Sequence, residues 1–547
     1  MPIEIAAPPV TDECTPKRAS SLPLPPLVSR GLFCLLLAVV AILIHGYHPF
    51  AVDGSIYVPA IKKQLNPDLY PRDAEFFLFP ARLSIFARLI ADSVRITHLP
   101  LEYMLLLWHT VTIAAFFAAC WRLCHLCFAT SWRALHGTLL MGALLTIPVA
   151  GTSLMIWDPY LTSRSFSTPA VLMAICCVLE RKLARAGTWL LVAAMVHPLM
   201  AAFGGVFVVT LYALENRNWR LIAATGFVSA ALVVAGMWWA RGVQIAPEYR
   251  EAVLTRSYFF LSRWTWYEIF GLIAPLVLFG LMLRYRRREQ DPRVANCLLA
   301  SLLCGVFFLA IGLAISETPN LLVIAKFQPL RAFHLLYILL FLLPVNVFLV
   351  KVTDGRPTAA AGLLTAVVAL MFVVQQQTFP ASPHVELPWS RSANDWVQAF
   401  DWVRSNTPRN AVFALDSRYT EVRGEDCQGF SARAERSSLP DISKAGGVAA
   451  LFPGLATDWA RETKATSEIE DLATERGQRV LEAAGASWIL LQRQEAGRLD
   501  CPYENAAVAV CRLQSEEPNL VERGRDERMP RVASLAGTST RGASTSR

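Results

Sequence analysis

The chain has 547 residues, of which 54% are hydrophobic and 17% are charged, and its mean hydropathy is +0.39. Soluble domains carry about 25% charged residues, and one or two cores of ordinary size cannot bury 29 Phe and 15 Trp. The composition therefore excludes an ordinary soluble enzyme and indicates that much apolar surface faces lipid. A net charge of +8 is small for this length and gives no indication of nucleic-acid binding.

The first 30 residues are rich in proline and carry Lys17, Arg18 and Arg30. We expect residues 1–30 to form a disordered cytoplasmic tail. The apolar run from Gly31 to Ile44 has no small-residue cleavage pattern after it, so it predicts an uncleaved first span.

Further apolar runs follow, several of them shorter than the roughly 20 residues of a full span. They lie near 101–121, 137–151, 168–180, 188–214, 221–240, 267–283, 296–315, 333–350 and 358–374. An interior proline loses a helix hydrogen bond, so Pro198 predicts that the run 188–214 is two short helices turning at His197-Pro198. The sequence thus predicts an α-helical polytopic membrane bundle over 31–375, with about 11 spans or half-spans.

Basic connections set the expected orientation. Arg181 with Lys182, Arg217 with Arg220, and the arginines between 284 and 293 lie in short connections that should be cytoplasmic. The N-terminus is then inside and the C-terminus outside, in a multi-pass protein of the inner (plasma) membrane.

Two long loops are expected outside. In the loop 46–100 the residues Leu83, Phe86 and Ile90 recur at near-helical spacing between arginines, which predicts an interfacial amphipathic helix. The aromatic residues of the loop 241–267 are expected to form a belt at the headgroup level. These aromatic residues are Tyr258, Phe259, Phe260, Trp264 and Trp266.

After Gln375 charged and small residues replace Leu and Val, so we expect a small extracytoplasmic α/β domain over 385–520 and a disordered tail over 521–547. Helices are predicted at 394–405 and 467–484, and buried strands at 411–415 and 488–491. Cys427, Cys501 and Cys511 fall in an oxidising compartment, where one disulfide is expected. We favour Cys501 with Cys511, and the other pairings stay open.

Two carboxylates follow the first span and are the candidate catalytic residues. Asp53 lies in the stretch 48–57 (HPFAVDGSIY), and Asp73 lies in Tyr70-Pro71-Arg72-Asp73. A carboxylate beside apolar walls has a raised pKa or binds a cation, and either property suits a general base or a metal ligand. A helix cap, or an ion pair with Arg72, is the structural alternative.

Polar groups from distant segments are expected to converge on the same side as candidate substrate-binding residues. They are His48, Asp158, Arg164, His197, Lys326, Gln328 and Arg331. A charged side chain close to a membrane span needs an ion-pair partner or a functional role. An arginine guanidinium can bind two oxygens of one phosphate group at once. Snorkelling to headgroups is the alternative for Arg331, and burial as a hydrogen-bonded core residue is the alternative for His197. The cluster Arg433, Glu435 and Arg436 is expected to be solvated, and a position at the border of a site is the alternative.

These features together resemble the GT-C class of membrane glycosyltransferases, over roughly residues 31–520. That class has an inside N-terminus, one span, and then a long external loop with an acidic catalytic residue, which Asp53 matches; Asp73 is a second candidate. The stretches His48–Gly54 and Gln328–Arg331 also resemble bacterial multi-span GT-C-like proteins of uncharacterised activity. The paired acidic signature of many GT-C members is absent here, since Gly54, Ser55 and Ile56 follow Asp53.

The resemblance implies an inverting transferase that moves a sugar from a polyprenyl-phosphate donor in the membrane to an acceptor outside, with Asp53 as general base. The acceptor is open, no cofactor is required, and a divalent metal is compatible with the carboxylates but not demanded. No Walker loop, Gly-x-Gly-x-x-Gly or His-Glu-x-x-His motif occurs. The alternatives are a multi-span transporter or lipid flippase, and a non-catalytic envelope assembly protein, which would point Asp53, Arg164 and Arg331 at different surfaces.

Overall fold

A computed structural model describes residues 27–128, 130–285, 291–315, 321–353, 356–467, 474–497 and 499–513. The predicted disordered tails lie outside these residues, except for 27–30, which already belong to the first helix. The described chain up to Leu513 forms one compact unit.

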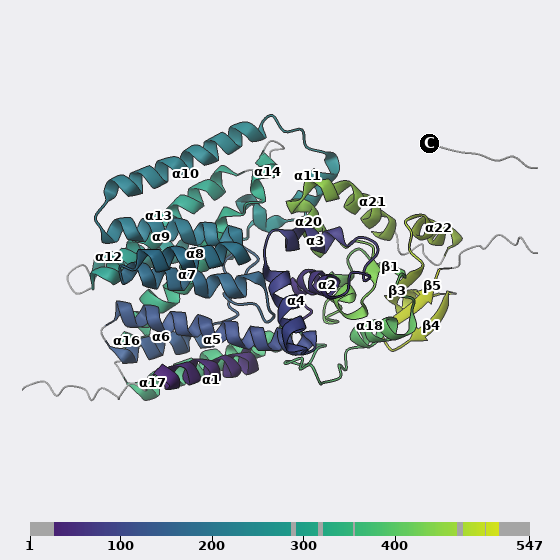
Figure 1. Ribbon diagram of the computed structural model, residues 1–547, viewed down its shortest axis with the longest axis horizontal. Helices are drawn as coiled ribbons and strands as arrows, with labels where there is room; N and C mark the ends of the chain where they lie inside the picture. The colour runs from purple at the N-terminus through teal and green to yellow at the C-terminus, as the bar shows by residue number, and fades with distance from the viewer. Residues whose placement is uncertain are drawn as a thin grey trace, which may run out of the picture. The chain divides into compact units, whose positions relative to one another are not determined.

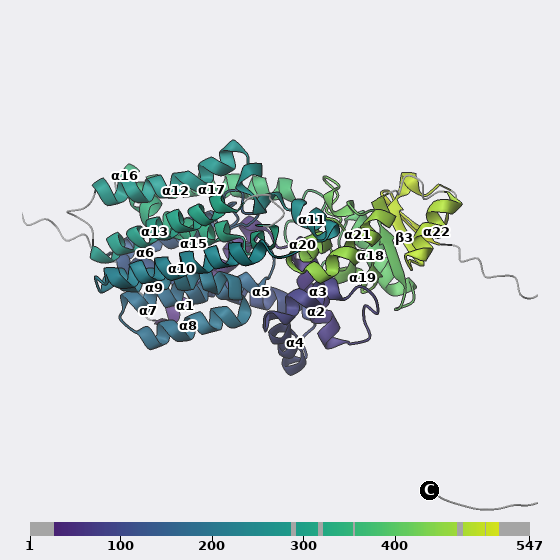
Figure 2. The same ribbon diagram turned by 90° about the horizontal axis from the view of Figure 1, so that it is seen from above.

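Long apolar helices form a bundle in which they lie side by side (Figures 1 and 2). They are α1 (Leu27–His45), α5 (Leu101–Cys127), α6 (Ser131–Ala143), α7 (Ser163–Leu179), α8 (Leu183–Val196), α9 (Pro198–Glu215), α10 (Trp219–Ala240), α12 (Trp266–Tyr285), α13 (Pro292–Ala314), α15 (Phe333–Leu340), α16 (Asn346–Val352) and α17 (Pro357–Thr378). A π-helical turn, Phe341–Val345, joins α15 to α16. Each predicted apolar run therefore contains a helix, although the run 137–151 is helical only up to Ala143.

Among the described residues, seven helical stretches are long and apolar enough to cross a membrane, and three apolar helices are shorter. The seven are Leu101–Cys127, Pro198–Glu215, Trp219–Ala240, Trp266–Arg284, Pro292–Ala314, Leu322–Val352 and Pro357–Thr378. The helix break predicted at His197-Pro198 is present, because α8 ends at Val196 and α9 begins at Pro198. These helices indicate a membrane protein.

The basic connections gather at one end of the bundle. The Arg122 Nη2 atom donates to Glu180 at 2.6 Å, Arg293 donates to the Leu126 carbonyl at 3.3 Å, and Asn296 donates to Glu215 at 2.8 Å. Each contact joins helix ends that belong to different helices. The loops that contain Asp53 and Asp158 lie at the opposite end, so the candidate acids and the basic connections are separated by the length of the bundle (Figure 1).

Short helices cover that opposite end. They are α2 (Gly54–Leu65), α3 (Glu75–Arg82), α4 (Phe86–Thr97), α11 (Pro247–Leu254), α14 (Leu322–Ala325), α20 (Lys444–Leu451) and α21 (Ala456–Ser467). Helix α11 packs on α20 and α21, and α3 packs on α20. Residues 444–467 of the C-terminal part therefore share a core with the two loops that were predicted to lie outside.

The C-terminal part is an α/β fold, as predicted. Its sheet has the order β2-β1-β3-β5-β4, in which β1 is parallel to β2 and β3, and β5 is antiparallel to β3 and β4. The strands are β1 (Val412–Leu415), β2 (Ser437–Ser438), β3 (Trp488–Gln492), β4 (Asp500–Glu504) and β5 (Val508–Arg512), and the further helices are α18 (Asp395–Asn406), α19 (Phe430–Ala434) and α22 (Glu475–Ala483). Residues 468–473 of the helix predicted at 467–484 lie outside the described residues.

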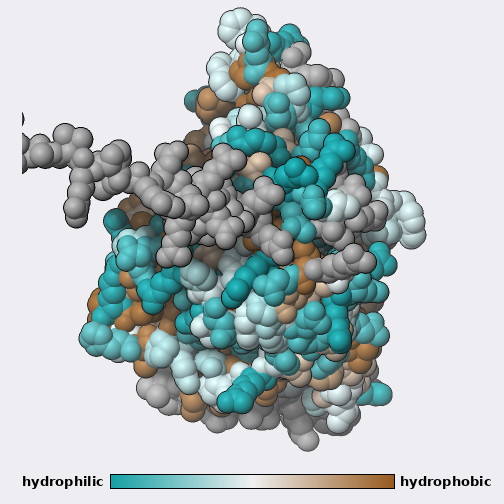
Figure 3. Space-filling model, turned by 90° about the vertical axis from the view of Figure 1, so that its right-hand side faces the viewer, coloured by the Kyte–Doolittle hydropathy of each residue, from teal (hydrophilic) through white to brown (hydrophobic). Residues whose placement is uncertain are grey.

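Strands β1 and β3 are buried on both faces, which explains why their sequences are continuously apolar. The Cys501–Cys511 disulfide is present and joins β4 to β5, as predicted. The surface at this end is a mixture of hydrophilic and pale residues with scattered hydrophobic ones (Figure 3). Helix α10, in contrast, exposes Phe227, Trp238 and Trp239 to at least 61%.

Helix α4 is present at the predicted place in the first long loop, and its residues Phe86 and Ile90 are buried in a core shared with α2 and α5, so this face packs against protein. In the loop 241–267, Phe259, Phe260 and Trp264 are buried. The loop folds back onto the C-terminal part and the bundle, so most of its aromatic residues do not form an exposed belt.

Candidate functional site

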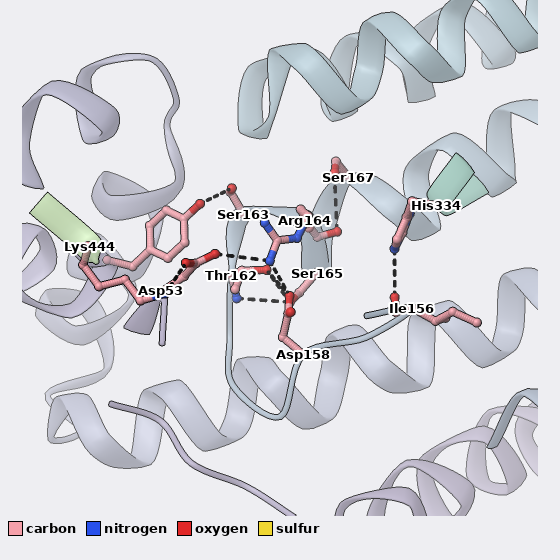
Figure 4. Close-up of polar contacts among 11 residues, drawn as sticks. Asp53, Ile156, Asp158, Thr162, Ser163, Arg164, Ser165, Ser167, His334 and Lys444 are labelled. Atoms are coloured by element: carbon pink, nitrogen blue, oxygen red, sulfur yellow. Dashed lines mark hydrogen bonds and ion pairs between the residues drawn. The ribbon is translucent and has the colours of Figure 1, made fainter. Parts of the chain in front are cut away.

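Asp53 is held by cations from two distant segments. It precedes the first turn of α2, and its Oδ2 atom lies 3.3 Å from Arg164 Nη2 while its Oδ1 atom lies 3.3 Å from Lys444 Nζ (Figure 4). Arg164 is in the first turn of α7, and Lys444 is the first residue of α20. Three parts of the chain thus meet at one carboxylate, of which 35% is exposed.

Arg164 also binds Asp158, at 2.7 Å, and both side chains are at least nine-tenths buried. The local sequence explains how the Arg164–Asp158 ion pair is held in place. Thr162 and Ser165 form a capping box at the N-terminus of α7, and Arg164 is the second residue of this helix. Tyr57, on α2, shares a 3.1 Å hydrogen bond with Ser163. This contact ties α2 to the start of α7 and so holds Asp53 beside Arg164.

The two carboxylates titrate differently. Burial alone raises the pKa of Asp53, but the charges of Lys444, Arg164 and Arg331 outweigh burial and hold that pKa well below its usual range. Of the two properties expected for such a carboxylate, a raised pKa or binding of a cation, Asp53 therefore shows the second, with Arg164 and Lys444 as the cations. Burial and the nearby Asp53 charge raise the pKa of Asp158, against the opposing effect of Arg164. Asp53 is ionised at neutral pH, and a proton added to the pair goes to Asp158 first.

Arg331 adds a third cation. Its guanidinium lies over the ring of Tyr258, 5.1 Å from the centroid, and its Nε atom is buried with no hydrogen-bond partner among the described residues. Gln328 begins the same turn in a left-handed conformation, with φ of +47°, and its buried Oε1 atom also has no partner there. Both residues line a small cavity with Tyr258. Two residues of one turn, each with a buried polar atom that has no partner among the described residues, therefore line the same cavity.

Two histidines lie behind the charged cluster. His197 caps the N-terminus of α9, and its Nδ1 accepts from the Met200 backbone at 3.5 Å. It is close enough to Arg164 and Arg331 for their charges to act on it. His334, which the sequence analysis did not identify, is bound to the Ile156 carbonyl at 2.9 Å (Figure 4). The predicted hairpin tip therefore does reach the cluster.

Asp73 lies in a neighbouring cavity and does not contact Asp53. This cavity is lined by Asp73, Asp441 and Lys444, so Lys444 lies between the two candidate acids. Arg72 Nε is 3.3 Å from Asp73. Burial and the nearby Glu462 charge raise the pKa of Asp73 to about 7, although Arg72 opposes them. The expected raised pKa and the expected contact with Arg72 are both present at this residue.

Two predicted site residues lie apart from the Asp53 cluster. His48 Nδ1 is 3.0 Å from Glu386, which also binds Arg433, and the His48 ring stacks on Phe379. Lys326 is half-buried beside Phe327 and makes no ion pair among the described residues. Neither residue contacts Asp53, Asp158 or Arg164 within the described chain.

The cluster 433–436 is not solvated, so that expectation is wrong. Arg433 binds Glu386, Glu435 binds Lys62 at 2.8 Å, and Arg436 is 4% exposed and donates to the Thr407 carbonyl. The Glu435–Lys62 ion pair joins the C-terminal part to α2, whereas the other two contacts lie within the C-terminal part. Lys444 was missed for a related reason: Ser443-Lys444-Ala445 has no motif, and only the packing of α20 against the first loop brings it to Asp53.

Within the described residues no group of three or more His, Cys, Asp and Glu side chains could hold a metal ion. The two carboxylates of the cluster are instead both engaged by Arg164. The fold and the site define a helical membrane protein with a charged, partly exposed cluster at one end of its bundle. No protein-family model and no curated protein matches the sequence.

Proposed function

We propose that the protein is a membrane glycosyltransferase that uses a polyprenyl-phosphate-linked sugar, and that the Asp53 cluster is its active site. The single observation that carries the proposal is the convergence of Asp53, Arg164 and Lys444 from three distant segments at one end of an apolar bundle, with Arg331 near enough for its charge to act on Asp53. A non-catalytic protein was expected to point Asp53, Arg164 and Arg331 at different surfaces, whereas Asp53 and Arg164 lie 3.3 Å apart as an ion pair.

The charges of the cluster favour an anion. Three cations, Arg164, Arg331 and Lys444, face two carboxylates, Asp53 and Asp158. Since the pKa of Asp158 is raised, the positive excess is at least one charge. Arg331 has a free Nε donor, and the arginine fork matches two phosphate oxygens. A phosphate-linked substrate is the anion that a membrane provides at this position.

An apolar helix lies beside the cationic segment. Helix α10 contacts α9 and α14, yet Ala240 is its one buried residue. Helix α14 leads directly into the segment Lys326–Arg331. Apart from the face that packs on its neighbours, α10 is apolar and exposed, and we expect lipid to cover that surface. We place the polyprenyl chain along α10 and α14, with its phosphate toward Arg331.

The proposed reaction breaks the bond between the sugar anomeric carbon and the phosphate oxygen. The acceptor hydroxyl attacks that carbon from the opposite face, its proton passes to Asp53, and polyprenyl phosphate leaves with the bonding electrons. The leaving phosphate gains a negative charge, which Arg331, Arg164 and Lys444 stabilise. As these cations turn toward phosphate, Asp53 loses their stabilisation and becomes a stronger base. The low pKa of the free cluster therefore does not prevent base catalysis.

Transfer of label tests this function. Proteoliposomes holding the purified protein receive a panel of radiolabelled undecaprenyl-phosphate sugars and an envelope extract as acceptor. We expect label in a lipid-free or new lipid product, and a loss of at least 100-fold in the Asp53→Asn variant, within the usual range for a general base. Asp92→Asn is the matched control, because Asp92 is an exposed aspartate paired with Arg95. An Asp53→Asn variant with full turnover would exclude the proposed role.

The break between α8 and α9 beside the cluster also suits a transporter with a site between half-helices. The same proteoliposomes separate the two functions. A transporter moves the labelled lipid head across the bilayer and leaves it chemically unchanged, whereas a transferase forms a covalent product.

A further inference from the structure

A cavity that is separate from the Asp53 cluster lies between the loop after α1 and the C-terminal part. It has a volume of about 600 Å³, within the range of small-molecule binding pockets. Its walls come from the loop after α1, from α2, from the start of α5, from the linker before α18, and from α18 itself. The lining includes Phe50, Lys62, Glu102, Glu386 and Gln398.

The ionic groups of this cavity are balanced. Four cations line it, Lys62, Arg391, Arg404 and Arg433, together with three carboxylates, Glu102, Glu386 and Asp401. Glu435 supplies a fourth negative charge, because it binds both Lys62, at 2.8 Å, and Arg404, at 3.0 Å. Arg433 is likewise paired with Glu386. A net charge of zero does not select a phosphate or a cation.

The cavity nevertheless offers many hydrogen-bonding groups of both kinds. Arg391 and Gln398 are exposed donors, and the Asp401 carboxylate accepts and makes no ion pair among the described residues. Tyr47 lines the cavity as a fully buried side chain, and its hydroxyl has no partner among those residues. A ligand that satisfies these groups must both donate and accept along its length.

Aromatic faces complete the wall. Arg433 lies over the Phe50 ring, 4.4 Å from its centroid, and fixes that ring at the cavity. Trp389, between the lining residues Pro388 and Ser390, is 63% exposed and pairs with Tyr103 at 6.0 Å. An exposed tryptophan at the edge of a polar cavity presents an apolar face, on which the CH face of a sugar ring packs.

We propose that this cavity binds a neutral oligosaccharide, which is the glycan acceptor of the transferase. A saccharide is uncharged, carries hydroxyls that donate and accept, and has apolar ring faces, as the lining requires. The role of acceptor rests on the proposed function, whereas saccharide binding does not. The segment from Tyr47 to Asp53 borders the cavity at Phe50 and reaches the cluster at Asp53, so one loop connects the two sites.

The test is binding of the full chain, in phospholipid nanodiscs free of sugar-headed detergent, to an array of neutral and acidic tri- to hexasaccharides. We expect saturable binding to neutral oligosaccharides, reduced at least tenfold in Trp389→Ala and in Asp401→Ala. Trp266→Ala is the matched control, since Trp266 is also exposed and pairs with a tyrosine, Tyr267, at 5.8 Å. It should bind as the wild type does.

Three results would overturn the inference: no neutral saccharide bound, binding restricted to acidic saccharides, or variants that bind like the wild type. Saccharide binding to the array requires neither the lipid-linked sugar donor nor an intact Asp53. Loss of transfer with retained array binding would therefore contradict only the proposed function, and transfer without array binding would contradict only this inference.

Discussion

Arg164 is the residue on which the charged cluster depends. It binds Asp53 and Asp158 together while 8% of its side chain is exposed. An arginine in that position neutralises two carboxylates that would otherwise repel each other at close range. The same arrangement makes Arg164 a stability determinant as well as a candidate phosphate ligand.

We predict that Arg164→Met destabilises the protein by about 3–5 kcal/mol, because it leaves Asp158 buried without its partner. Thermal unfolding in nanodiscs measures the effect. Arg95→Met is the control, since Arg95 and Asp92 are about half exposed and such pairs contribute about 0–1 kcal/mol. Equal melting temperatures for the two variants would contradict the description of Arg164.

Asp73 provides a prediction on pH dependence. Its pKa is raised to about 7 by burial and by Glu462, so the folded protein binds the proton more tightly than the unfolded chain does. Stability from this group is therefore full below about pH 4 and falls as pH rises toward 7. Asp73→Asn mimics the protonated state. Its melting temperature should exceed that of the wild type at pH 8, and the two should approach each other at pH 5.

A constant difference between the two proteins across this pH range would show that Asp73 has an ordinary pKa. Asp500→Asn, a change at an exposed strand residue, controls for the loss of one negative charge from the whole protein.

At the scale of elements, the sequence predicted the helices and the main strands because their signals are local. Apolar runs, Pro198 and the continuous apolar segments at 411–415 and 488–491 each specify an element without reference to the rest of the chain. Where Phe86 and Phe260 pack could not be read in the same way. An apolar face looks identical whether protein or lipid covers it, and here protein does.

Strands β4 and β5 are joined covalently as well as by hydrogen bonds. The disulfide between Cys501 and Cys511 closes a loop of sequence separation 10, which should contribute about 2–3 kcal/mol. The double variant Cys501→Ser/Cys511→Ser is therefore expected to melt at a lower temperature than the oxidised wild type. Under reducing conditions the difference should shrink. Maleimide labelling checks the pairing. Each single variant should be labelled at its remaining cysteine of the pair, whereas the oxidised wild type should not be labelled at either position.

At the scale of the whole molecule, the candidate site is formed by contacts between segments that are far apart in sequence. The order of the predicted spans placed several polar loops at one end of the bundle, so their side chains were predicted to converge. These side chains are Asp53, Asp158, Arg164, His197 and Arg331. Lys444 was not predicted, since its approach to Asp53 depends on the docking of α20 against α3 and α11. His48 and Lys326 shared the predicted end but not the cluster. The number of preceding helices predicts at which end of the bundle a loop lies. It does not predict where across that end the side chains of the loop lie.

The proposed orientation can be checked directly. If the basic connections are cytoplasmic, alkaline phosphatase fused after Leu513 is active and green fluorescent protein fused there is dark. Fusions after Arg217, in the connection between α9 and α10, should give the opposite pattern. A bright fluorescent fusion after Leu513 would place the Asp53 cluster in the cytosol and contradict a donor site in the outer leaflet.

The central claim is that this cluster holds a lipid-linked phosphate, and native mass spectrometry of the protein with undecaprenyl phosphate tests it most directly. We expect the wild type to retain the lipid, and Arg331→Met and Lys444→Met each to weaken its binding at least tenfold. Arg95→Met should retain it like the wild type. Equal retention by all four proteins, or equal retention of phosphatidylglycerol in place of undecaprenyl phosphate, would contradict the claim.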